Sequence, residues 1–394
     1  MLIATCTYTR ASGWASPLPS QNDSADTLVL AFGASEYLDD PAPFDALRAA
    51  FPLAHHVGCS TAGEIAGRHV HDASVSVAVI RFEHCSLRAA SAALDGPDSS
   101  ATVGRLLAAQ LPTDGLRAVI LLSDGLHANG TALLDGLVPM LPPGVRVFGG
   151  LAGDGCRFQR TWVFEGGPLG EGGESGERDD RTPLASRRVR AIGLYGERLA
   201  IGIGCDGGWS DFGPERCVTR SVGNVLFELD HRPALDLYKE YLGELASGLP
   251  ASALLFPLSV RRHAGGRVLV RTVLSVDEVA KSMTFAGDVP EGASARLMRA
   301  NNDALIRSAE RAGAQAVAGL EGAAAQLLVS ISCVGRRLVL GERSDEEVEA
   351  VFDSAGGAAA HVGFYSYGEI APQLAGGASD LHNQTMTIVA IGER

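Results

Sequence analysis

Short apolar runs alternate with helical patterns along the chain, and together they predict a repeated strand and helix unit. The first unit begins with an apolar, β-rich run at residues 27–32 and continues into a helical pattern at residues 44–51. A second apolar run leads into a glycine-containing turn at residues 56–65, and a further strand pattern follows at residues 71–80. Patterns that switch between a period of two and a period of 3.6 predict strands packed against helices.

The same order returns at the end of the chain. A strand pattern at residues 327–332 precedes a helix, a turn at residues 361–370 and a last strand pattern at residues 382–391. Ser344 and Glu347 predict a capping box at the start of this helix, because a serine hydroxyl and a glutamate three residues later can satisfy each other's backbone N–H groups. The two ends of the chain therefore predict one duplicated module.

A middle copy is less complete. It has a strand pattern at residues 118–122, a helical pattern at residues 133–137 and a glycine turn at residues 145–154. Two further strand patterns follow at residues 161–164 and 189–195. Its glycines are closer together by one residue than those of the other turns. We therefore interpret this part as a third, diverged copy of the module.

The repeated order predicts a mixed α/β (α+β) fold in which internally duplicated, mixed β-sheets are covered by helices. A length of 394 residues favours two domains. We expect an N-terminal extension at 1–26, an N-terminal domain at 27–225 and a C-terminal domain at 226–394. Residues 166–188, rich in glycine and charge, are expected to form a mobile hairpin loop, since few apolar side chains offset the entropy of ordering them.

Two helices are expected in the C-terminal domain. Pro233 occupies a position that suits the first turn of a helix, and Leu235, Tyr238 and Tyr241 form an apolar stripe behind it. A second helix is expected between Ser294 and Ala312, where apolar residues recur at helical spacing.

Composition narrows the class of partner and the location. The formal net charge of −13 disfavours nucleic acid and anionic membranes, whose binding depends on lysine and arginine. We expect a cytoplasmic protein, because the N-terminus lacks the pattern of a signal peptide and no apolar run approaches about 20 residues. Seven cysteines, none in a C-x-x-C pair, predict neither a disulfide framework nor a structural zinc site.

The turns at residues 58–64 and 363–369 form the candidate ligand site. Their glycine spacing is similar to that of a phosphate loop, but Glu64 and Glu369 stand where such a loop has lysine, and a carboxylate repels phosphate. Nucleotide binding by this route is therefore excluded. The turns are either tight corners at strand ends or recognition loops, in which backbone N–H groups bind an anionic or carbonyl group and an acid binds an amine.

The residues expected to contact a small-molecule ligand come from the three turns and from the polar run before the last strand. They are Gly58, Cys59, Ser60, Thr61, Gly63, Glu64, Gly150, Asp154, Tyr365, Ser366, Tyr367, Glu369, His382, Asn383 and Gln384. Strand alternation would direct Tyr365 and Tyr367 to one side and Phe364 and Ser366 to the other, one pair toward the pocket and one toward the core. Capping of the strand by its own polar side chains is an equal alternative for the run at 382–385.

An enzyme is the competing hypothesis. It would use Cys59 as a nucleophile, or Asp124 and His127 from the middle copy. Against Cys59, the matching position of the last copy is Phe364, and a packed thiol beside a turn is the simpler interpretation. Ser366 does not lie in the Gly-x-Ser-x-Gly pattern of a hydrolase. We therefore predict no catalytic residue; a scaffold without a small ligand is a third interpretation.

Two histidines occupy matching places, His71 and His382, each expected to open the strand after its turn. Either could ligate a haem iron, because one histidine in an apolar pocket is a sufficient protein ligand. A hydrogen-bonded strand terminus is the alternative. The cofactor is therefore unknown, with haem as one possibility.

Five separated segments together resemble the FIST family from about residue 27 onward. They are Val-Gly-Cys-Ser-Thr-Ala-Gly-Glu-Ile at 57–65, Gly-Gly-Leu-Ala-Gly-Asp-Gly at 149–155, Pro-Ala-Leu-Asp-Leu-Tyr at 233–238, Ser-Cys-Val-Gly-Arg-Arg at 332–337 and Gly-Phe-Tyr-Ser-Tyr-Gly-Glu-Ile at 363–370. The resemblance implies a sensor of bacterial signal transduction that binds a small molecule, with amino acids or related metabolites proposed as ligands. Some members bind haem, sense nitric oxide and act on a histidine kinase. The resemblance also implies that this chain, with no output segment apparent, acts on a separate signalling partner.

Overall fold

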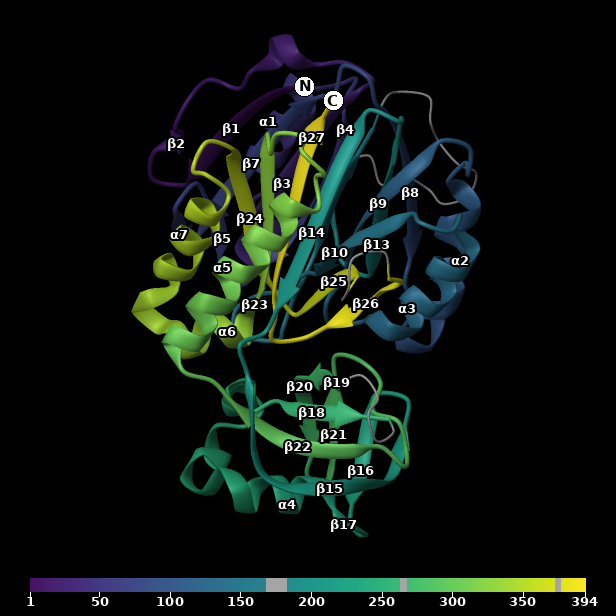
Figure 1. Cartoon of the computed structure of the whole chain (residues 1–394), viewed down its shortest axis with the longest axis vertical. Helices are drawn as coiled ribbons and strands as arrows, with labels where there is room; N and C mark the ends of the chain where they lie inside the picture. The colour runs from purple at the N-terminus through teal and green to yellow at the C-terminus, as the bar shows by residue number, and fades with distance from the viewer. Residues whose placement is uncertain (168–182, 263–267, 373–376) are drawn as a thin grey trace.

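The computed structural model describes residues 1–167, 183–262, 268–372 and 377–394, which form a body and a lobe (Figure 1). The body consists of the described parts of 1–209 and 300–394. The lobe consists of the described parts of 210–299, so that it is inserted into the chain of the body. The mixed α/β fold predicted from the sequence is confirmed.

The body contains three copies of one module, each with the order edge strand, strand, helix, parallel strand, hairpin and antiparallel strand. The first copy contains β1 (Leu2–Thr9), β3 (Thr27–Ala34), α1 (Ala42–Ala50), β4 (His55–Thr61), β5 (Glu64–Ala66), β6 (His69–His71) and β7 (Ser74–Arg81). The second contains β8 (Ser86–Ala93), α2 (Ser100–Gln110), β9 (Leu116–Ser123), α3 (Gly130–Leu137), β10 (Arg146–Leu151), β11 (Val163–Gly166), β12 (Leu184–Ala185) and β13 (Arg188–Tyr195). The third contains β14 (Leu199–Asp206), α5 (Asn302–Ala318), β23 (Leu327–Cys333), α6 (Val334–Leu340), α7 (Ser344–Ser354), β24 (Ala360–Ser366), β25 (Gly368–Pro372), β26 (Ser379–His382) and β27 (Met386–Glu393).

Three mixed sheets follow from these copies. Their strand orders are β12-β11-β4-β3-β7-β1-β2, with β2 at Gly13–Trp14, then β26-β25-β10-β9-β13-β8, and β14-β27-β23-β24-β5-β6. In each sheet the two inner strands of a copy are parallel, and the last strand of the copy is antiparallel to them. The sheets stand side by side in the body with helices outside them (Figure 1).

One glycine in each copy sets the close approach of the two parallel strands. A Cβ atom at Gly58, Gly149 or Gly363 would lie 1.8, 1.9 or 2.0 Å from a carbonyl oxygen of the neighbouring strand. No other residue could occupy these positions without moving the backbone, because real Cβ contacts are never this short. The glycines of the predicted turns therefore serve strand packing first.

The hairpins are exchanged between copies in a cycle. Hairpin β5–β6 of the first copy pairs with β24 of the third, and hairpin β25–β26 of the third pairs with β10 of the second. Hairpin β11–β12 of the second copy pairs with β4 of the first. Each copy therefore completes the sheet of another, and the three form one interlocked body.

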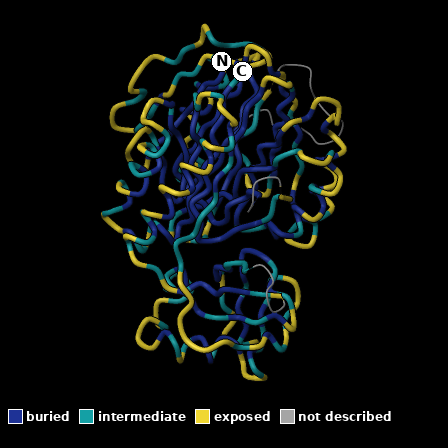
Figure 2. The backbone as a smooth tube through the Cα atoms, in the orientation of Figure 1, coloured by how far each residue is buried: buried dark blue, intermediate teal, exposed yellow. Residues whose placement is uncertain are grey.

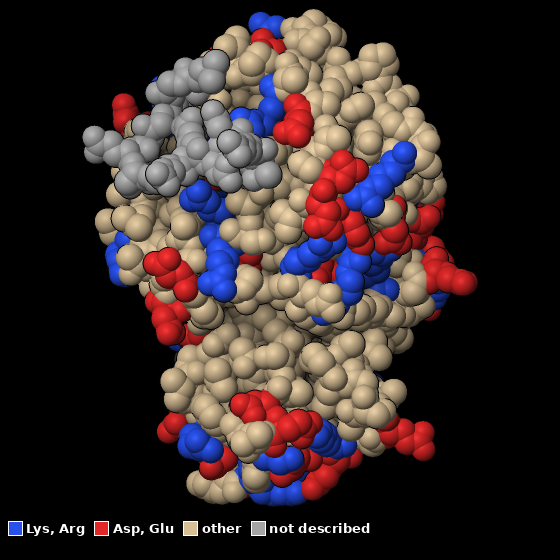
Figure 3. Space-filling model, turned by 180° about the vertical axis from the view of Figure 1, so that it is seen from behind, with Lys and Arg blue, Asp and Glu red and all other residues tan. Residues whose placement is uncertain are grey.

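The core of the body lies between the sheets. Buried backbone fills the centre and exposed residues lie on the outer helices and loops (Figure 2). Phe32 of the first copy stacks on Phe364 of the third, with ring centroids 4.6 Å apart. On the rear surface basic and acidic side chains intermingle on both body and lobe (Figure 3).

The lobe has its own sheet and its own apolar core. Its elements are β15 (Ser210–Val222), β16 (Val225–Leu229), α4 (Ala234–Leu242), β18 (Leu258–Arg261), β19 (Val268–Arg271), β20 (Val273–Asp277), β21 (Ser282–Phe285) and β22 (Ser294–Arg299), with the sheet order β19-β18-β22-β15-β16-β21-β20. Helix α4 packs Leu235 and Tyr238 into this core. The helix predicted after Pro233 is thus confirmed.

The expected domain boundaries can be compared with the sheets. The segment 1–26 contains β1, which pairs along its whole length with β7 of the first copy. The boundary expected between residues 225 and 226 falls in the lobe, and the chain after the lobe returns to the body. The division into an N-terminal and a C-terminal domain at this boundary therefore stays a prediction, and it does not coincide with the division into body and lobe.

Two local predictions are wrong in detail. Residues 294–299 are strand β22 rather than the start of a helix, because they alternate between buried and exposed faces and pair with β15 and β18. Helix α5 starts only after Asn301, whose side chain caps it by accepting from Ala304 N. Helix α7 is present but lacks the capping box, since the Ser344 hydroxyl donates to Gly341 O and Glu347 is buried against Arg336.

The two matching histidines also differ from the prediction. His71 and His382 end the short strands β6 and β26 rather than opening the strands that follow. Their equivalence holds, because His71 pairs with Glu64 and His382 pairs with Glu369 across the two hairpins. Residues 168–182 of the segment expected to be mobile lie outside the described ranges, while β11 and β12 at its ends pair as a hairpin.

Candidate functional site

The three glycine turns meet at the centre of the body, where backbone atoms join them directly. Ala62 N donates to Tyr365 O (2.8 Å), Tyr365 N donates to Gly63 O (2.9 Å) and Gly153 N donates to the backbone of Ser60 (2.9 Å). A Cβ at Gly153 would lie 3.2 Å from Ala62 N. The structure therefore brings the predicted turns together, and their own contacts fill the space between them.

Glu64 and Glu369 hold matching hairpins closed. Glu64 accepts from the backbone N–H (3.0 Å) and hydroxyl (2.7 Å) of Ser74 and from the Thr61 hydroxyl. In the third copy Glu369 accepts the equivalent hydrogen bonds from Thr385 (3.1 and 3.0 Å) and from Ser366 (2.6 Å). Both acids are buried and accept hydrogen bonds from groups of their own hairpins.

Burial dominates the titration of both carboxyl groups. It raises the pKa of Glu64 to about 7 and that of Glu369 to about 8, although the hydroxyl and amide donors act in the opposite direction. The low dielectric of the core penalises the charged form more than these donors stabilise it.

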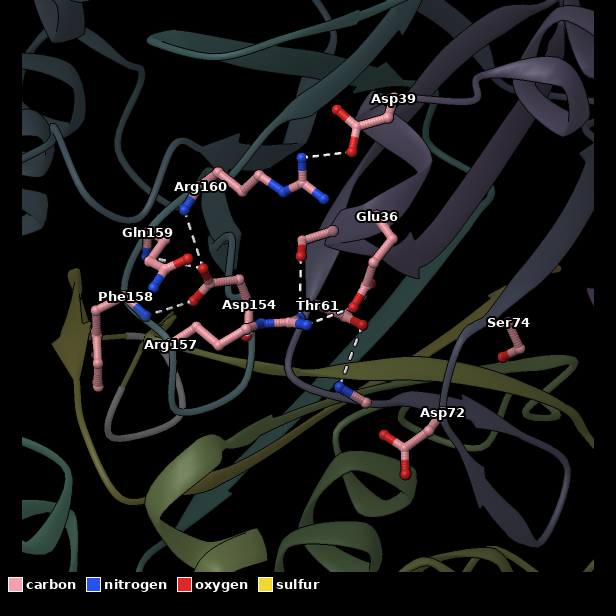
Figure 4. A network of polar contacts seen from close by, with 12 residues as sticks. Glu36, Asp39, Thr61, Asp72, Ser74, Asp154, Arg157, Phe158, Gln159 and Arg160 are labelled. Carbon is pink, nitrogen blue, oxygen red and sulfur yellow. Dashed lines mark hydrogen bonds and ion pairs between the residues drawn. The ribbon is translucent and has the colours of Figure 1, made fainter.

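Asp154 of the middle copy orders its own loop. Its carboxylate accepts from the backbone N–H groups of Phe158 (2.9 Å), Gln159 (2.8 Å) and Arg160 (2.9 Å), and from the Tyr367 hydroxyl. Figure 4 shows the contacts of Asp154 with this loop, and Arg157 extending from the same loop toward Glu36. The acid is fully buried and serves as an internal anion in a nest of amides.

The remaining turn residues are packed. Tyr365 and Tyr367 lie in one apolar cluster and Phe364 lies in another, so the predicted alternation along the strand is present. All three rings are buried, and the Tyr365 hydroxyl donates to Glu347 (2.8 Å) in the core. Gly150 is also closed in, since a Cβ there would lie 2.9 Å from Gly368 O.

The groups of the enzyme hypothesis are poorly placed for chemistry. Cys59 is completely buried, and burial holds the pKa of its thiol well above its usual value, which suppresses the thiolate. Asp124 is buried and accepts from Leu126 N (2.9 Å), from the backbone N (2.9 Å) and Nδ1 (3.0 Å) of His127 and from Arg187 N (2.8 Å). This carboxylate orders the turn after β9.

Neither candidate histidine fits a haem iron. His71 is exposed on a surface hairpin, and His382 is 6% exposed with Nε2 3.0 Å from Ala371 O. Haem needs a large apolar pocket around its ligand, and no histidine lines the cavities of about 440 and 410 Å³ found among the described residues. Among the described residues no group of three histidine, cysteine, aspartate or glutamate side chains is arranged to hold a metal ion.

The polar run at 382–385 connects the body to the lobe. Asn383 Oδ1 accepts from Thr272 N of the lobe (3.3 Å), and Gln384 Nε2 donates to Leu254 O in the lobe (3.0 Å). Trp209, in the linker, donates from Nε1 to Gln384 O (2.8 Å). The donors and acceptors of this polar run therefore form hydrogen bonds that join the lobe and its linker to the body.

A cavity of about 440 Å³ lies at the same junction, on the side of α3 and β26. It is lined by Thr131, Leu134, Asp135, Val138, Pro139, Ala378, Ser379 and Asp380 of the body and by Arg262, Leu269 and Arg271 of the lobe. A second hollow of about 410 Å³, also lined by Arg262 and with Asp288 at its edge, lies on the lobe. Arg262 therefore lines both the junction cavity and the hollow on the lobe.

Side chains of opposite charge line this cavity. The body supplies Asp135 and Asp380, and the lobe supplies Arg262 and Arg271. Arg271 is 1% exposed and donates from Nη1 to Leu381 O (3.2 Å), which holds its guanidinium at the junction. Partial burial, and then repulsion by Asp288 and Asp380, raise the pKa of Asp135. Such a cavity can hold a small molecule that carries both a negative and a positive group.

Sequence reasoning missed this cavity. Its aspartates are separated from its arginines by more than one hundred positions along the chain, and no local spacing or motif connects Asp135 with Arg262. The cavity forms only where the lobe packs beside α3, so that residues of both parts line it.

Comparison with known proteins agrees with the modular architecture. The FIST N domain matches residues 27–232 and the FIST C domain matches residues 234–372. None of the curated proteins matches the chain at a significant level. No helix in the described ranges has the length and apolar character needed to cross a membrane. With both family domains matched over most of its length, the chain belongs to the FIST family, whose domains are sensory, small-ligand-binding domains of signal transduction.

Proposed function

We propose that this protein senses a small polar metabolite bound in the cavity between body and lobe. One observation carries the proposal: aspartates of the body and arginines of the lobe line the same cavity of about 440 Å³. A ligand with a carboxylate and an amine would satisfy both walls at once, since arginine binds carboxylates and aspartate binds ammonium groups. Amino acids and related zwitterions are the first class to test.

The glycine turns take an indirect part in this proposal. They hold the three copies together behind the junction, and the run at 382–385 transmits the position of the lobe to them through Asn383 Nδ2 and Tyr367 O (3.2 Å). The ligand residues originally expected at Glu64, Asp154 and Glu369 are replaced in the proposal by Asp135, Asp380, Arg262 and Arg271.

The response would pass to a separate protein. FIST domains are sensory rather than catalytic, and a cytoplasmic histidine kinase is the partner class that we propose. We do not extend the proposal to haem or nitric oxide, because His71 is exposed and His382 bonds to the backbone. Co-purification with such a kinase, and a change in its autophosphorylation on adding this protein, would support the partner.

Thermal unfolding in the presence of a metabolite panel tests the ligand site. A ligand that binds only the folded state raises the melting temperature, and at one hundred times its Kd it stabilises the protein by about 2.7 kcal/mol. Arg262→Ala and Asp135→Asn should each reduce the shift caused by zwitterions. Arg198→Ala, which removes an exposed arginine beside His84, is the matched control and should leave the shift unchanged. If no zwitterion shifts the wild type, the proposed ligand class is wrong.

A further inference from the structure

Two adjacent linkers join the lobe to the body. Residues 207–209 lead from β14 into β15, and residues 300–301 lead from β22 into α5. Ser210 pairs with Arg299, so the linkers leave the lobe side by side. Figure 1 shows them on one side of the junction, away from α3 and β26, and Figure 3 shows a narrow waist there. Two neighbouring linkers form a natural hinge, because few dihedral angles need to change.

The body ends of both linkers are anchored. Arg336, which is fully buried, donates to Gly207 O in the first linker (2.5 Å) and to Leu305 O at the start of α5 (2.9 Å). Trp209 is also held, through its bond to Gln384 O. Bending would therefore occur on the lobe side of these anchors.

On the side away from the linkers the lobe is held through Asp288. Asn129 Nδ2 donates to Asp288 Oδ1 (2.9 Å), and Asp288 N lies 3.4 Å from the Thr131 hydroxyl that accepts from it. Asn129 is also the N-cap of α3, since its Oδ1 accepts from Ala132 N. A carboxylate at the positive end of a helix is favourable. Gly287 permits this contact, because a Cβ there would lie 2.7 Å from Thr131 Oγ1.

Other hydrogen bonds also join the lobe to the body, among them Gln384 Nε2 to Leu254 O (3.0 Å) and Arg271 Nη1 to Leu381 O (3.2 Å). Thr272 N reaches Asn383 at 3.3 Å, which is long for a hydrogen bond. Thr272 Oγ1 and Gln384 Oε1 are buried at the junction without a hydrogen-bond partner among the described residues. Unpaired buried polar atoms cost free energy that water would return when the lobe moves away. The contact at Asp288 is the one that joins the lobe to the N-terminus of α3, on the side away from the linkers.

We propose that the lobe swings on its two linkers and that the contact between Asp288 and Asn129 latches it closed over the cavity. Thr131 belongs both to the latch and to the cavity wall, so the latch controls how the cavity opens. That the latch controls access of a ligand rests on the proposed function. The latch itself, a contact that holds the lobe against the body, does not depend on any ligand.

Two native cysteines allow a direct test. Cys156 on the body and Cys217 on the lobe are exposed, while the other cysteines are buried or partly buried. Spin labels on these two, in a Cys205→Ala background, report the distance between lobe and body by pulsed electron paramagnetic resonance. The ligand-free wild type should show one main distance.

The sharpest variant is Asn129→Asp. Aspartate keeps the oxygen that caps α3 but sets a second carboxylate against Asp288. The main distance should be lost and a population at a different distance should appear. Adding Asp288→Asn swaps donor and acceptor across the latch and should restore the wild-type distribution. Asp288→Ala should release the lobe from the other side, and Glu244→Ala, at an exposed lobe acid, is the control.

Each outcome decides the question. A wild-type distance distribution in folded Asn129→Asp or Asp288→Ala overturns the latch, and so does a double variant that fails to restore the distribution. Circular dichroism melting confirms that each variant is folded, and Asp288→Ala stands in if Asn129→Asp does not fold. Since no ligand is added, a failed latch leaves the thermal-shift result on the ligand site untouched, and a failed ligand screen leaves the latch result untouched.

Discussion

Arg336 and Glu347 form a buried ion pair at the base of the two linkers, with Nη2 and Oε2 2.7 Å apart and neither side chain exposed. Glu347 also accepts from the hydroxyls of Ser332 (3.0 Å) and Tyr365 (2.8 Å). The pair therefore ties α6 and α7 to the centre where the glycine turns meet. Its hydrogen bonds are complete, which offsets the cost of burying two charges.

Removing one partner of this pair should be strongly destabilising. Arg336→Met leaves Glu347 buried without its cation, and we expect a loss of about 3–5 kcal/mol in the free energy of unfolding. Urea unfolding followed by circular dichroism measures it. Arg343→Ala removes an arginine that pairs at the surface with Glu346, and should cost no more than about 1 kcal/mol. Equal losses in the two variants would contradict the assigned role of the buried pair.

Stability should fall as the pH rises from 6.5 to 8. Glu64 and Glu369 have folded pKa values of about 7 and about 8 against an ordinary value of 4.5, so the folded state holds more protons than the unfolded state in this range. Raised carboxyl pKa values stabilise the fold at low pH, and this contribution is lost as pH rises through the folded pKa. The expected loss between pH 6.5 and 8 is about 2 kcal/mol.

The test compares urea unfolding of the wild type with that of Glu64→Gln/Glu369→Gln, which keeps the shape but cannot ionise. The double variant should lack this fall in stability between pH 6.5 and 8, whereas Glu342→Gln, at an exposed acid, should follow the wild type. The window begins at 6.5 because burial lowers the pKa of His55 to about 4 and that of His56 to about 3. Their contribution to stability rises with pH below 6.5 and would mask the carboxyl effect.

The sequence predicts the module better than the assembly. Each strand and helix of a copy depends on local periodicity, and the matching of Glu64 with Glu369 survives in detail, down to the equivalent hydroxyl partners. The cyclic exchange of hairpins was not predictable, because the pairing of β5 with β24 joins residues about 300 positions apart and any of the three sheets offered a suitable edge.

The site shows the same limit. The turns were singled out as binding loops because glycines permit close approach, but the group that approaches is the neighbouring strand rather than a ligand. Apolar residues at helical spacing between Ser294 and Ala312 predict one helix there, and only the pairing of residues 294–299 with β15 and β18 decides for a strand in that part. No sequence pattern marks Asp135 or Arg262 as a binding residue, because the two become neighbours only where the lobe packs against the body.

Replacing a close-approach glycine should disrupt the body. Gly363→Ala would place a methyl group 2.0 Å from Ser330 O on the neighbouring strand, and the two strands would have to separate. We expect a loss of at least about 3 kcal/mol in the free energy of unfolding, in the range of severe overpacking. Gly248→Ala is the control, because its Cβ would meet only Ser252 at an ordinary 3.4 Å. Wild-type stability of Gly363→Ala would contradict the packing role.

Cysteine reactivity should separate the structural thiols from the exposed ones. Under native conditions at neutral pH, iodoacetamide should modify Cys156 and Cys217 first, because these are the exposed thiols. Cys59 should stay unmodified until the protein unfolds, since it is completely buried and its thiol pKa is held well above the usual value. Mass spectrometry of tryptic peptides at several times measures the order. Rapid native alkylation of Cys59 would contradict its buried placement and revive the nucleophile hypothesis, whereas Cys59→Ala with an unchanged ligand response would exclude the thiol from function.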